Sequence, residues 1–245
     1  MIIRLEEQLS EILGRPLSYI LLLPEEGRAA RRLLILLHGA GEGPEILLEN
    51  GGLTDTVPPD LAVLLPAAGN SFYLDWGRDR NVRSALLQEL LPAVRQRFSL
   101  SDAREDNVLG GISMGGFGAL SIALCEPEHF SAAFSLSGAL DLKRAAQLFR
   151  ICQLPPPGDL MQAAYLPEAN LTERLEVLAE TGTDKPALYL AWGDRDWFRD
   201  ANRSFAEQAG QPGFSIPAGE SPGLHDWVYW KQQLPPALSW AAEVQ

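Results

Sequence analysis

The sequence predicts an α/β fold, in which one domain is built on a mostly parallel sheet with helices on both faces. Short apolar runs alternate with amphipathic stretches along the whole chain, a pattern typical of parallel sheets. The 245 residues suit one sizeable domain, and a hydrophobic content of 46% is enough for a core on each face of a sheet. A G-x-S-x-G turn at 111–115 lies between an apolar run and a helical stretch.

The composition limits the classes of partner. A net charge of -12 argues against nucleic acid and anionic membranes, since both require basic patches. Charges interrupt the first apolar residues, so the sequence predicts no signal peptide and no membrane span. We expect a soluble, cytoplasmic protein in which Cys125 and Cys152 are reduced thiols. Because neither a C-x-x-C pattern nor clustered histidines occur, no metal site is expected.

The first half of the chain supplies four predicted strands and one long helix. The strands are apolar runs closed by turn residues or glycines, at 17–23, Arg32–Leu37, 61–65 and 108–112. The residues 82–98 have the apolar spacing of an amphipathic helix. Pro92 falls inside that helix, where we expect a kink or a restart.

The second half continues the alternation around one long excursion. Further strands are predicted at 130–136, 187–192 and 214–216, with helices at 117–124 and 201–209 and a last helix that opens after 227. Residues 138–186 break the pattern, with helical stretches at 142–149 and 172–180 around the proline cluster 155–158. Long excursions in compact domains are usually functional, so we expect a cap over the active site; a purely structural insertion is the alternative.

Ser113 is the candidate nucleophile. In a nucleophile elbow, a sharp turn after a central strand lifts the serine hydroxyl above the sheet, and small residues on either side permit the turn. The turn also aims the backbone N–H of Met114 at the position of an oxyanion. The glycine-rich loop after the strand Arg32–Leu37 would supply a second donor, which we assign to Ala40 in preference to Gly39.

A serine of ordinary pKa needs a base, and the base needs a carboxylate that orients it. In this architecture the chain order is serine, acid, histidine, so His38 is expected to order its loop instead of acting as the base. His129 lies at the wrong end of the sheet, which leaves His225. Three acids follow the strand that ends at 192, and spacing does not separate the first two of them: Asp194, Asp196 and Asp200. Asp226, beside the base, is expected to be a surface residue or to cap a helix, and not to act in catalysis.

Aromatic residues near the carboxyl ends of the strands are candidates for the substrate pocket, because ligands bind at that edge of an open parallel sheet. Packing of a long loop is the equal alternative for those at 72–76. The candidates are Phe72, Tyr73 and Trp76, together with Trp197 and Trp227 beside the acid and the base.

Several of these motifs together resemble the putative esterase family of α/β-hydrolases, which includes esterase D, tributyrin-type esterases, feruloyl esterases and mycolyltransferases. The resemblance covers nearly the whole chain and is carried by GISMGGFGAL at 111–120, HG at 38–39, SFYLDW at 71–76, FSLSG at 134–138 and GLHDW at 223–227. It implies an α/β-hydrolase fold and hydrolysis of carboxylic esters without a cofactor. The family's acid stands in a G-x-x-D pattern, which maps onto 193–196 and favours Asp196.

The expected function is therefore that of a serine carboxylesterase acting on small neutral esters with short-chain acyl or aryl groups. The loop after 38–39 lacks the cysteine-bearing pattern of S-formylglutathione hydrolases, so that substrate is not expected. Small tributyrin-type esterases are the nearest likeness. Two alternatives stay open: acyl transfer to an alcohol or sugar, and a catalytically idle module that binds a partner. The sequence does not give the oligomeric state.

Overall fold

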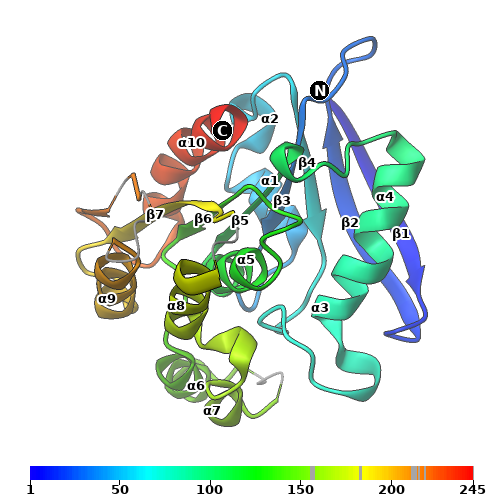
Figure 1. Ribbon diagram of the computed structural model, residues 1–245. Helices are drawn as coiled ribbons and strands as arrows, with labels where there is room; N and C mark the ends of the chain where they lie inside the picture. Colours follow the sequence, from blue (N-terminus) through cyan, green and yellow to red (C-terminus); the bar gives the residue numbers. More distant parts are fainter. Residues whose placement is uncertain (155–157, 182–183, 211–213, 215, 218, 245) are drawn as a thin grey trace.

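The computed structural model describes residues 1–154, 158–181, 184–210, 214, 216–217 and 219–244 (Figure 1). Within these ranges, eight strands form one sheet in the order β1-β2-β4-β3-β5-β6-β7-β8. Their bounds are β1 (Ile2–Ser10), β2 (Arg15–Leu23), β3 (Arg32–Leu37), β4 (Leu61–Pro66), β5 (Asn107–Ile112), β6 (Ala132–Leu136), β7 (Ala187–Gly193) and β8 (Glu220–Ser221). The pairs from β4 to β8 are parallel, whereas β1 and β2 are antiparallel at one edge. The sheet is therefore mostly parallel, as the alternating pattern predicts.

Helices cover both faces of this sheet. Their bounds are α1 (Pro44–Glu49), α2 (Leu53–Thr56), α3 (Val82–Ala85), α4 (Leu91–Phe98), α5 (Met114–Cys125), α6 (Leu142–Ile151), α7 (Leu160–Ala163), α8 (Leu171–Thr181), α9 (Arg199–Gly210) and α10 (Trp227–Glu243), with 3₁₀ turns at Arg78–Arg80, Arg104–Asp106 and Pro167–Ala169. The buried side chains of α3, α4, α5, α6 and α8 share one hydrophobic cluster, and those of α1, α2 and α10 share the other.

The central strand β3 shows how the sequence builds two cores. Leu33, Ile35 and Leu37 point into the cluster under α5, and the alternate residues Leu34 and Leu36 point into the cluster under α10. All five side chains are at most 1% exposed. Full burial of each contributes roughly 1.5–3 kcal/mol, which is why a strand covered on both faces is apolar throughout.

Glycines let helix α5 approach the sheet closely. A Cβ on Gly111 would lie 2.1 Å from the carbonyl oxygen of Gly115, and a Cβ on Gly115 would lie 2.0 Å from that of Leu37. Any side chain at either position would push the start of α5 away from β5 and β3. The turn between β5 and α5, which carries Ser113, is thereby fixed at the carboxyl edge of the central strands.

The predicted final strand at 214–216 is wrong. Phe214 is buried in the core and its N–H donates to the carbonyl of Ala209, so it closes the end of α9. Ile216 also lies outside any strand, and residue 215 is outside the described residues. The last strand is instead β8, whose two residues pair with Trp192 and Gly193.

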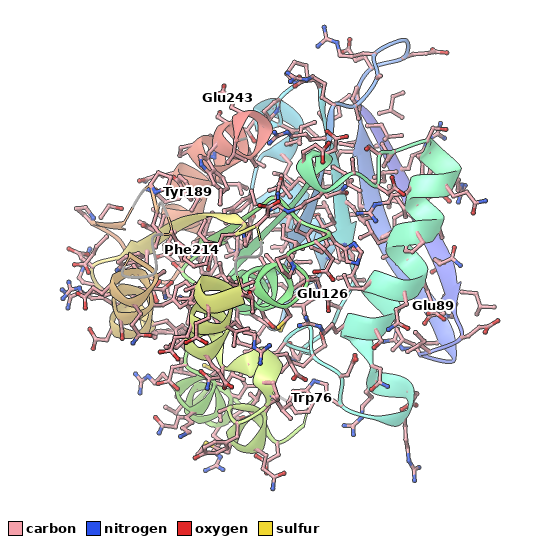
Figure 2. All side chains as sticks on the ribbon, in the orientation of Figure 1. Trp76, Glu89, Glu126, Tyr189, Phe214 and Glu243 are labelled. Carbon is pink, nitrogen blue, oxygen red and sulfur yellow. The ribbon has the colours of Figure 1, made fainter. Side chains whose placement is uncertain are left out.

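The long helix at 82–98 continues past Pro92 without a restart. Five residues, Leu86–Leu90, form a π-helical segment between α3 and α4, and Pro92 stands in the first turn of α4. Proline removes one i→i−4 hydrogen bond from a continuous helix, and the π-helical segment directly before Pro92 is where the helix departs from that hydrogen-bond pattern. The widened turn also places Glu89 against the β1–β2 hairpin, where its carboxylate accepts the N–H groups of Glu11 at 3.0 Å and Ile12 at 3.1 Å (Figure 2).

Candidate active site

Ser113 occupies the sharp turn between β5 and α5. Its φ of 56° and ψ of -114° lie outside the common regions for a non-glycine residue. Backbone hydrogen bonds hold this conformation, since its N–H donates to the carbonyl of Leu136 at 2.9 Å and its carbonyl accepts from Phe117 at 3.1 Å and Ala139 at 2.9 Å. The strained turn presents the hydroxyl at the carboxyl edge of the sheet.

Two other loops at that edge bring a histidine and a carboxylate to the serine. The Ser113 hydroxyl lies 2.9 Å from Nε2 of His225, which stands in the loop between β8 and α10. Nδ1 of His225 lies 3.0 Å from each carboxylate oxygen of Asp196, which follows β7. Asp196 is 7% exposed, and Oδ1 also accepts the N–H of Phe198 at 2.7 Å. A carboxylate against Nδ1–H leaves Nε2 free to accept the serine proton.

The neighbouring acids have other partners. Asp194 accepts the N–H of Gly223 at 3.0 Å, so it orders the loop that carries His225. Asp226 accepts the N–H of Tyr229 at 3.0 Å and caps α10, which confirms its predicted role. Asp200 has a side chain that is 94% exposed, within α9. Of the three acids that the sequence leaves open, the structure brings Asp196 to the histidine.

Aromatic rings enclose the imidazole of His225. Trp197 stacks on it with centroids 5.2 Å apart and an interplanar angle of 19°, and it remains 53% exposed. Phe198 and Trp230 meet the imidazole edge-to-face, at 5.4 Å and 5.0 Å. Sequence reasoning did not single out Phe198 or Trp230, because an aromatic residue in a loop or an amphipathic helix normally indicates packing.

The loop after β3, residues 38–43, passes beside the serine and is called the oxyanion loop below. His38 is fully buried: its Nδ1 lies 2.8 Å from the carbonyl of Gly39, and its Nε2 accepts the N–H of Ala68 at 3.0 Å. Burial lowers the pKa of His38 below 6.5, which favours this neutral, two-bond state. The ring thus orders its loop, as the chain order predicts. A Cβ on Gly39 would lie 3.7 Å from Cβ of Ser113, so the backbone of the oxyanion loop passes close to the serine at Gly39. Ala40 is the next residue along this loop.

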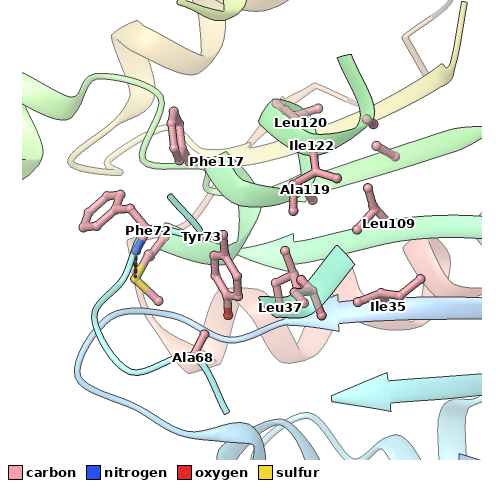
Figure 3. Packing of buried hydrophobic residues seen from close by; sticks show 14 of the residues in the cluster. Ile35, Leu37, Ala68, Phe72, Tyr73, Leu109, Phe117, Ala119, Leu120 and Ile122 are labelled. Atoms are coloured by element: carbon pink, nitrogen blue, oxygen red, sulfur yellow. Dashed lines mark hydrogen bonds between the residues drawn. The ribbon is translucent and has the colours of Figure 1, made fainter. Parts of the chain in front are cut away.

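Met114 is the first residue of α5, where helical geometry leaves the backbone N–H without an intrahelical acceptor. Its side chain is buried, and its sulfur accepts the N–H of Phe72 at 3.3 Å (Figure 3). Ala40 and Met114 both line the cavity next to Ser113. The two backbone positions predicted for the oxyanion donors therefore lie beside the serine on different elements, Ala40 in the oxyanion loop and Met114 at the start of α5.

A cavity of about 350 Å³ opens at Ser113 and His225. One wall comes from the stretch predicted as a cap, since α6 and the residues after it supply the side chains Ala145, Leu148, Phe149, Cys152 and Leu154. Of the predicted aromatic candidates, Phe72, Trp197 and Trp227 line it. The helices predicted at 142–149 and 172–180 correspond to α6 and α8, and α7 was not predicted. Residues 155–157 of the proline cluster lie outside the described residues.

Tyr73 and Trp76 do not line this cavity, which corrects their assignment to the pocket. Tyr73 is fully buried beside Leu37, and its hydroxyl donates to the carbonyl of His38 at 3.2 Å (Figure 3). The indole of Trp76 donates to the carbonyl of Ser71 at 2.7 Å, and a Cβ on Gly158 would lie 2.2 Å from its ring. Both side chains brace loops around the site.

Glu42 is a cavity residue that sequence reasoning missed. Its Oε1 accepts the indole N–H of Trp227 at 2.6 Å, whereas its Oε2 is buried without a hydrogen-bond partner among the described residues. Burial raises the pKa of Glu42 above 4.5, and the bond from Trp227 and the charge of His225 oppose that shift. A lone glutamate between glycines resembles a solvated turn, so only tertiary structure identifies it.

Within the described ranges, the acids and histidine that come close enough to share a metal ion are Glu126, Glu128 and His129. They are mostly solvent-exposed and follow the far end of α5, away from Ser113. His129 itself has a side chain that is 59% exposed. No described helix combines the length and the apolar character that crossing a bilayer requires.

Comparisons with known proteins place nearly the whole chain in one family. A family model described as "Putative esterase" matches residues 10–241. An acetyl esterase from Caldicellulosiruptor saccharolyticus is 28% identical over 233 residues, which are 87% of this chain and 84% of that protein.

Solved structures share the fold. S-formylglutathione hydrolase FrmB from Staphylococcus aureus superposes with a TM-score of 0.84 at 21% identity, covering 99% of this chain and 100% of that one. A ferulic acid esterase gives a TM-score of 0.81 at 20% identity, covering 100% of this chain and 98% of the other. At these identities the likeness shows the fold alone, and it confirms the predicted α/β-hydrolase fold.

Proposed function

The chain belongs to the putative esterase family and is a carboxylic ester hydrolase, and from this premise we propose that it cleaves small neutral esters with Ser113, His225 and Asp196. The observation that carries the proposal is the continuous line of contacts from the Ser113 hydroxyl to Nε2 of His225 at 2.9 Å and from Nδ1 to the Asp196 carboxylate at 3.0 Å. A serine with a base in hydrogen-bond reach, and a base oriented by a buried acid, is the arrangement that nucleophilic acyl chemistry requires.

The reaction has two halves. His225 takes the proton of Ser113 as the oxygen attacks the ester carbonyl, and the backbone N–H groups of Ala40 and Met114 hold the oxyanion. His225 then gives the proton to the departing alcohol, which leaves an acyl-enzyme. Water activated by the same imidazole attacks the acyl carbonyl, and the acid is released with the serine restored. Asp196 stays ionised and orients the imidazole throughout.

The cavity supports short-chain acyl or aryl groups as substrates. Its volume is about 350 Å³, and the wall formed by Phe72, α6 and Leu154 is apolar. A neutral acyl group of a few carbons, or one aromatic ring, fits such a wall without leaving a buried charge unpaired. We expect hydrolysis rates of chromogenic esters to fall between acetyl and octanoyl, with methyl ferulate as the aryl test.

Ser113→Ala tests the proposal directly. The variant is expected to fold and to lose roughly 10⁴-fold or more in kcat, because the nucleophile is gone. A fluorophosphonate probe should label the wild-type protein and Ser101→Ala, a surface control, but not Ser113→Ala. Ester hydrolysis that survives undiminished in Ser113→Ala would contradict the mechanism.

A further inference from the structure

One side-chain hydrogen bond joins two loops of the site that lie far apart in sequence. The indole N–H of Trp227 donates to Oε1 of Glu42 at 2.6 Å, across a sequence separation of 185 residues. Glu42 belongs to the oxyanion loop, which follows β3. Trp227 is the first residue of α10 and directly follows residues 222–226, called the histidine loop here, which follow β8. The bond therefore connects the carboxyl ends of two strands at opposite sides of the serine.

On the side of the histidine loop, the bond continues into the rings around the base. Trp227 meets Trp230 edge-to-face, with centroids 5.3 Å apart and an angle of 86°. Trp230 in turn meets the imidazole of His225 edge-to-face at 5.0 Å. A shift of Trp227 would move the aromatic surface against which the imidazole rests. The position of the base is thus mechanically coupled to the indole that Glu42 holds.

On the side of the oxyanion loop, the same carboxylate lies against the loop's backbone. A Cβ on Gly39 would lie 3.1 Å from Oε2 of Glu42 and 3.7 Å from Cβ of Ser113. Oε2 of Glu42 and Cβ of Ser113 therefore lie on either side of the space that a methyl group on Gly39 would occupy. Ala40, whose N–H is a proposed oxyanion donor, is the next residue along the loop.

The burial of Glu42 carries an energetic cost that packing alone does not explain. Oε2 is buried without a partner in the described part of the chain, and burial raises the pKa of the carboxyl group. A buried acceptor without a donor destabilises a folded protein. Residues that break local rules of stability concentrate at functional sites, where the geometry they impose is useful.

We propose that Glu42 is a positioning residue, whose hydrogen bond with Trp227 locks the oxyanion loop to the histidine loop. Oxyanion donors act only within hydrogen-bond distance of the developing charge, and a displacement of about 1 Å can cost roughly 100-fold in rate. Because the Ala40 N–H and the His225 imidazole are supplied by different loops, a direct bond between those loops restricts their relative position beyond what the sheet and His38 provide. The inference rests on the proposed function, since it concerns the same reaction.

A double-mutant cycle on p-nitrophenyl acetate hydrolysis tests the lock. Glu42→Ala and Trp227→Phe each remove the bond, and each is expected to lower kcat roughly tenfold to a hundredfold with a smaller change in KM. The kcat of the double variant should be no lower than that of the slower single variant, because both changes break the same interaction. Glu42→Gln keeps an acceptor for the indole and should recover most of the loss. Glu49→Ala is the control, because Glu49 is an exposed acid at the end of α1 and its removal takes away a nearby negative charge without breaking the bond.

Three outcomes would overturn the lock. Losses that multiply in the double variant would mean that the two residues act independently. A Glu42→Gln variant as slow as Glu42→Ala would mean that the negative charge matters and the bond does not. An effect confined to KM would assign both residues to substrate contact. If Glu42→Ala does not fold, Trp227→Phe and Glu42→Gln still make opposite predictions for kcat.

The controls separate this inference from the proposed function. Wild-type protein that hydrolyses the ester and is labelled at Ser113 by the fluorophosphonate probe upholds the proposed function whatever the Glu42 variants do. Unchanged kcat in Glu42→Ala and Trp227→Phe, against that background, would reject the lock alone. Wild-type protein that neither hydrolyses esters nor reacts with the probe would reject the proposed function first.

Discussion

Replacing His38 with alanine tests how the oxyanion loop is held. The ring is fully buried, with Nδ1 2.8 Å from the carbonyl of Gly39 and Nε2 3.0 Å from the N–H of Ala68. His38→Ala removes both bonds and leaves two buried backbone groups without these partners. Each orphaned group costs about 1–3 kcal/mol, and the lost ring volume adds to that. We expect a total of about 3–6 kcal/mol and, for a chain of this size, a fall in Tm on the order of 10 °C.

The pH dependence of this effect has a definite sign. Burial lowers the pKa of His38 from 6.5, so below that pH the unfolded chain binds a proton that the folded protein rejects. Stability supplied by the neutral ring is therefore complete above pH 6.5 and is lost as the pH falls toward the folded pKa. Alanine has no such proton. The difference in free energy of unfolding between wild type and His38→Ala should shrink on acidification, by up to about 1.4 kcal/mol per pH unit.

Thermal and urea unfolding from pH 5 to 8, read by circular dichroism, measure both effects. His129→Ala is the matched control, because that side chain is 59% exposed and should change neither quantity appreciably. Where His38→Ala still folds, we also expect kcat to fall by up to roughly 10²–10³, the range for loss of one oxyanion donor. A stability loss below 1 kcal/mol, or a deficit that grows as the pH falls, would refute the account of His38 as a neutral loop anchor.

Three further predictions concern the acid, the buried carboxyl and the elbow. Asp196→Asn should lower kcat about 10⁴-fold, while Asp194→Asn, which keeps an acceptor for its backbone partner, should lose far less in the same ester assay; equal losses would contradict the assignment. Glu42→Gln should raise Tm at neutral pH, because the raised pKa of Glu42 destabilises the folded state as the pH rises above 4.5. A variant whose Tm equals that of the wild type at every pH from 4 to 8 would count against this prediction. Gly115→Ala places a Cβ 2.0 Å from the last carbonyl oxygen of β3 and should unfold the protein at a much lower temperature than Gly210→Ala, whose Cβ meets nothing within 4 Å.

The interior strands of the sheet could be predicted because burial on both faces produces a continuous apolar run in the sequence. β3 matches its predicted bounds, since a strand between two helical layers is apolar along its buried length, here every residue after Arg32. The edge strands have a weaker sequence pattern. β1 pairs with β2 along nine residues, yet Leu5 and Leu9 are 74% and 67% exposed, and its charges hide the alternation. β8 has only two residues, too few for any periodic pattern, whereas the apolar run at 214–216 has the pattern of a strand without forming one.

The site shows the same division. The G-x-S-x-G turn selected Ser113, and chain order together with the strand ends selected His225, because parallel strands bring the loops at their carboxyl ends together. They could not separate Asp194 from Asp196, which share a loop and differ only in where each carboxylate turns. Asp194 turns to the N–H of Gly223 and Asp196 turns to His225, and both distances depend on a loop that is 29 residues away.

Glu42 marks where reasoning from sequence ends for a physical reason. Periodicity records which residues face a core, because the same helix or strand repeats the same environment many times. A contact between loops from two different strands occurs once, so the glutamate at 42 and the tryptophan at 227 have no repeating pattern to reveal their pairing. Oε2 of Glu42 is buried without a donor among the described residues, and that cost would favour an apolar residue unless the bond from Trp227 to Oε1 served the reaction. Measuring both kcat and Tm of Glu42→Gln therefore separates the effect on rate from the effect on stability. A variant with a higher Tm and an unchanged kcat would show that the site requires the hydrogen bond and not the negative charge.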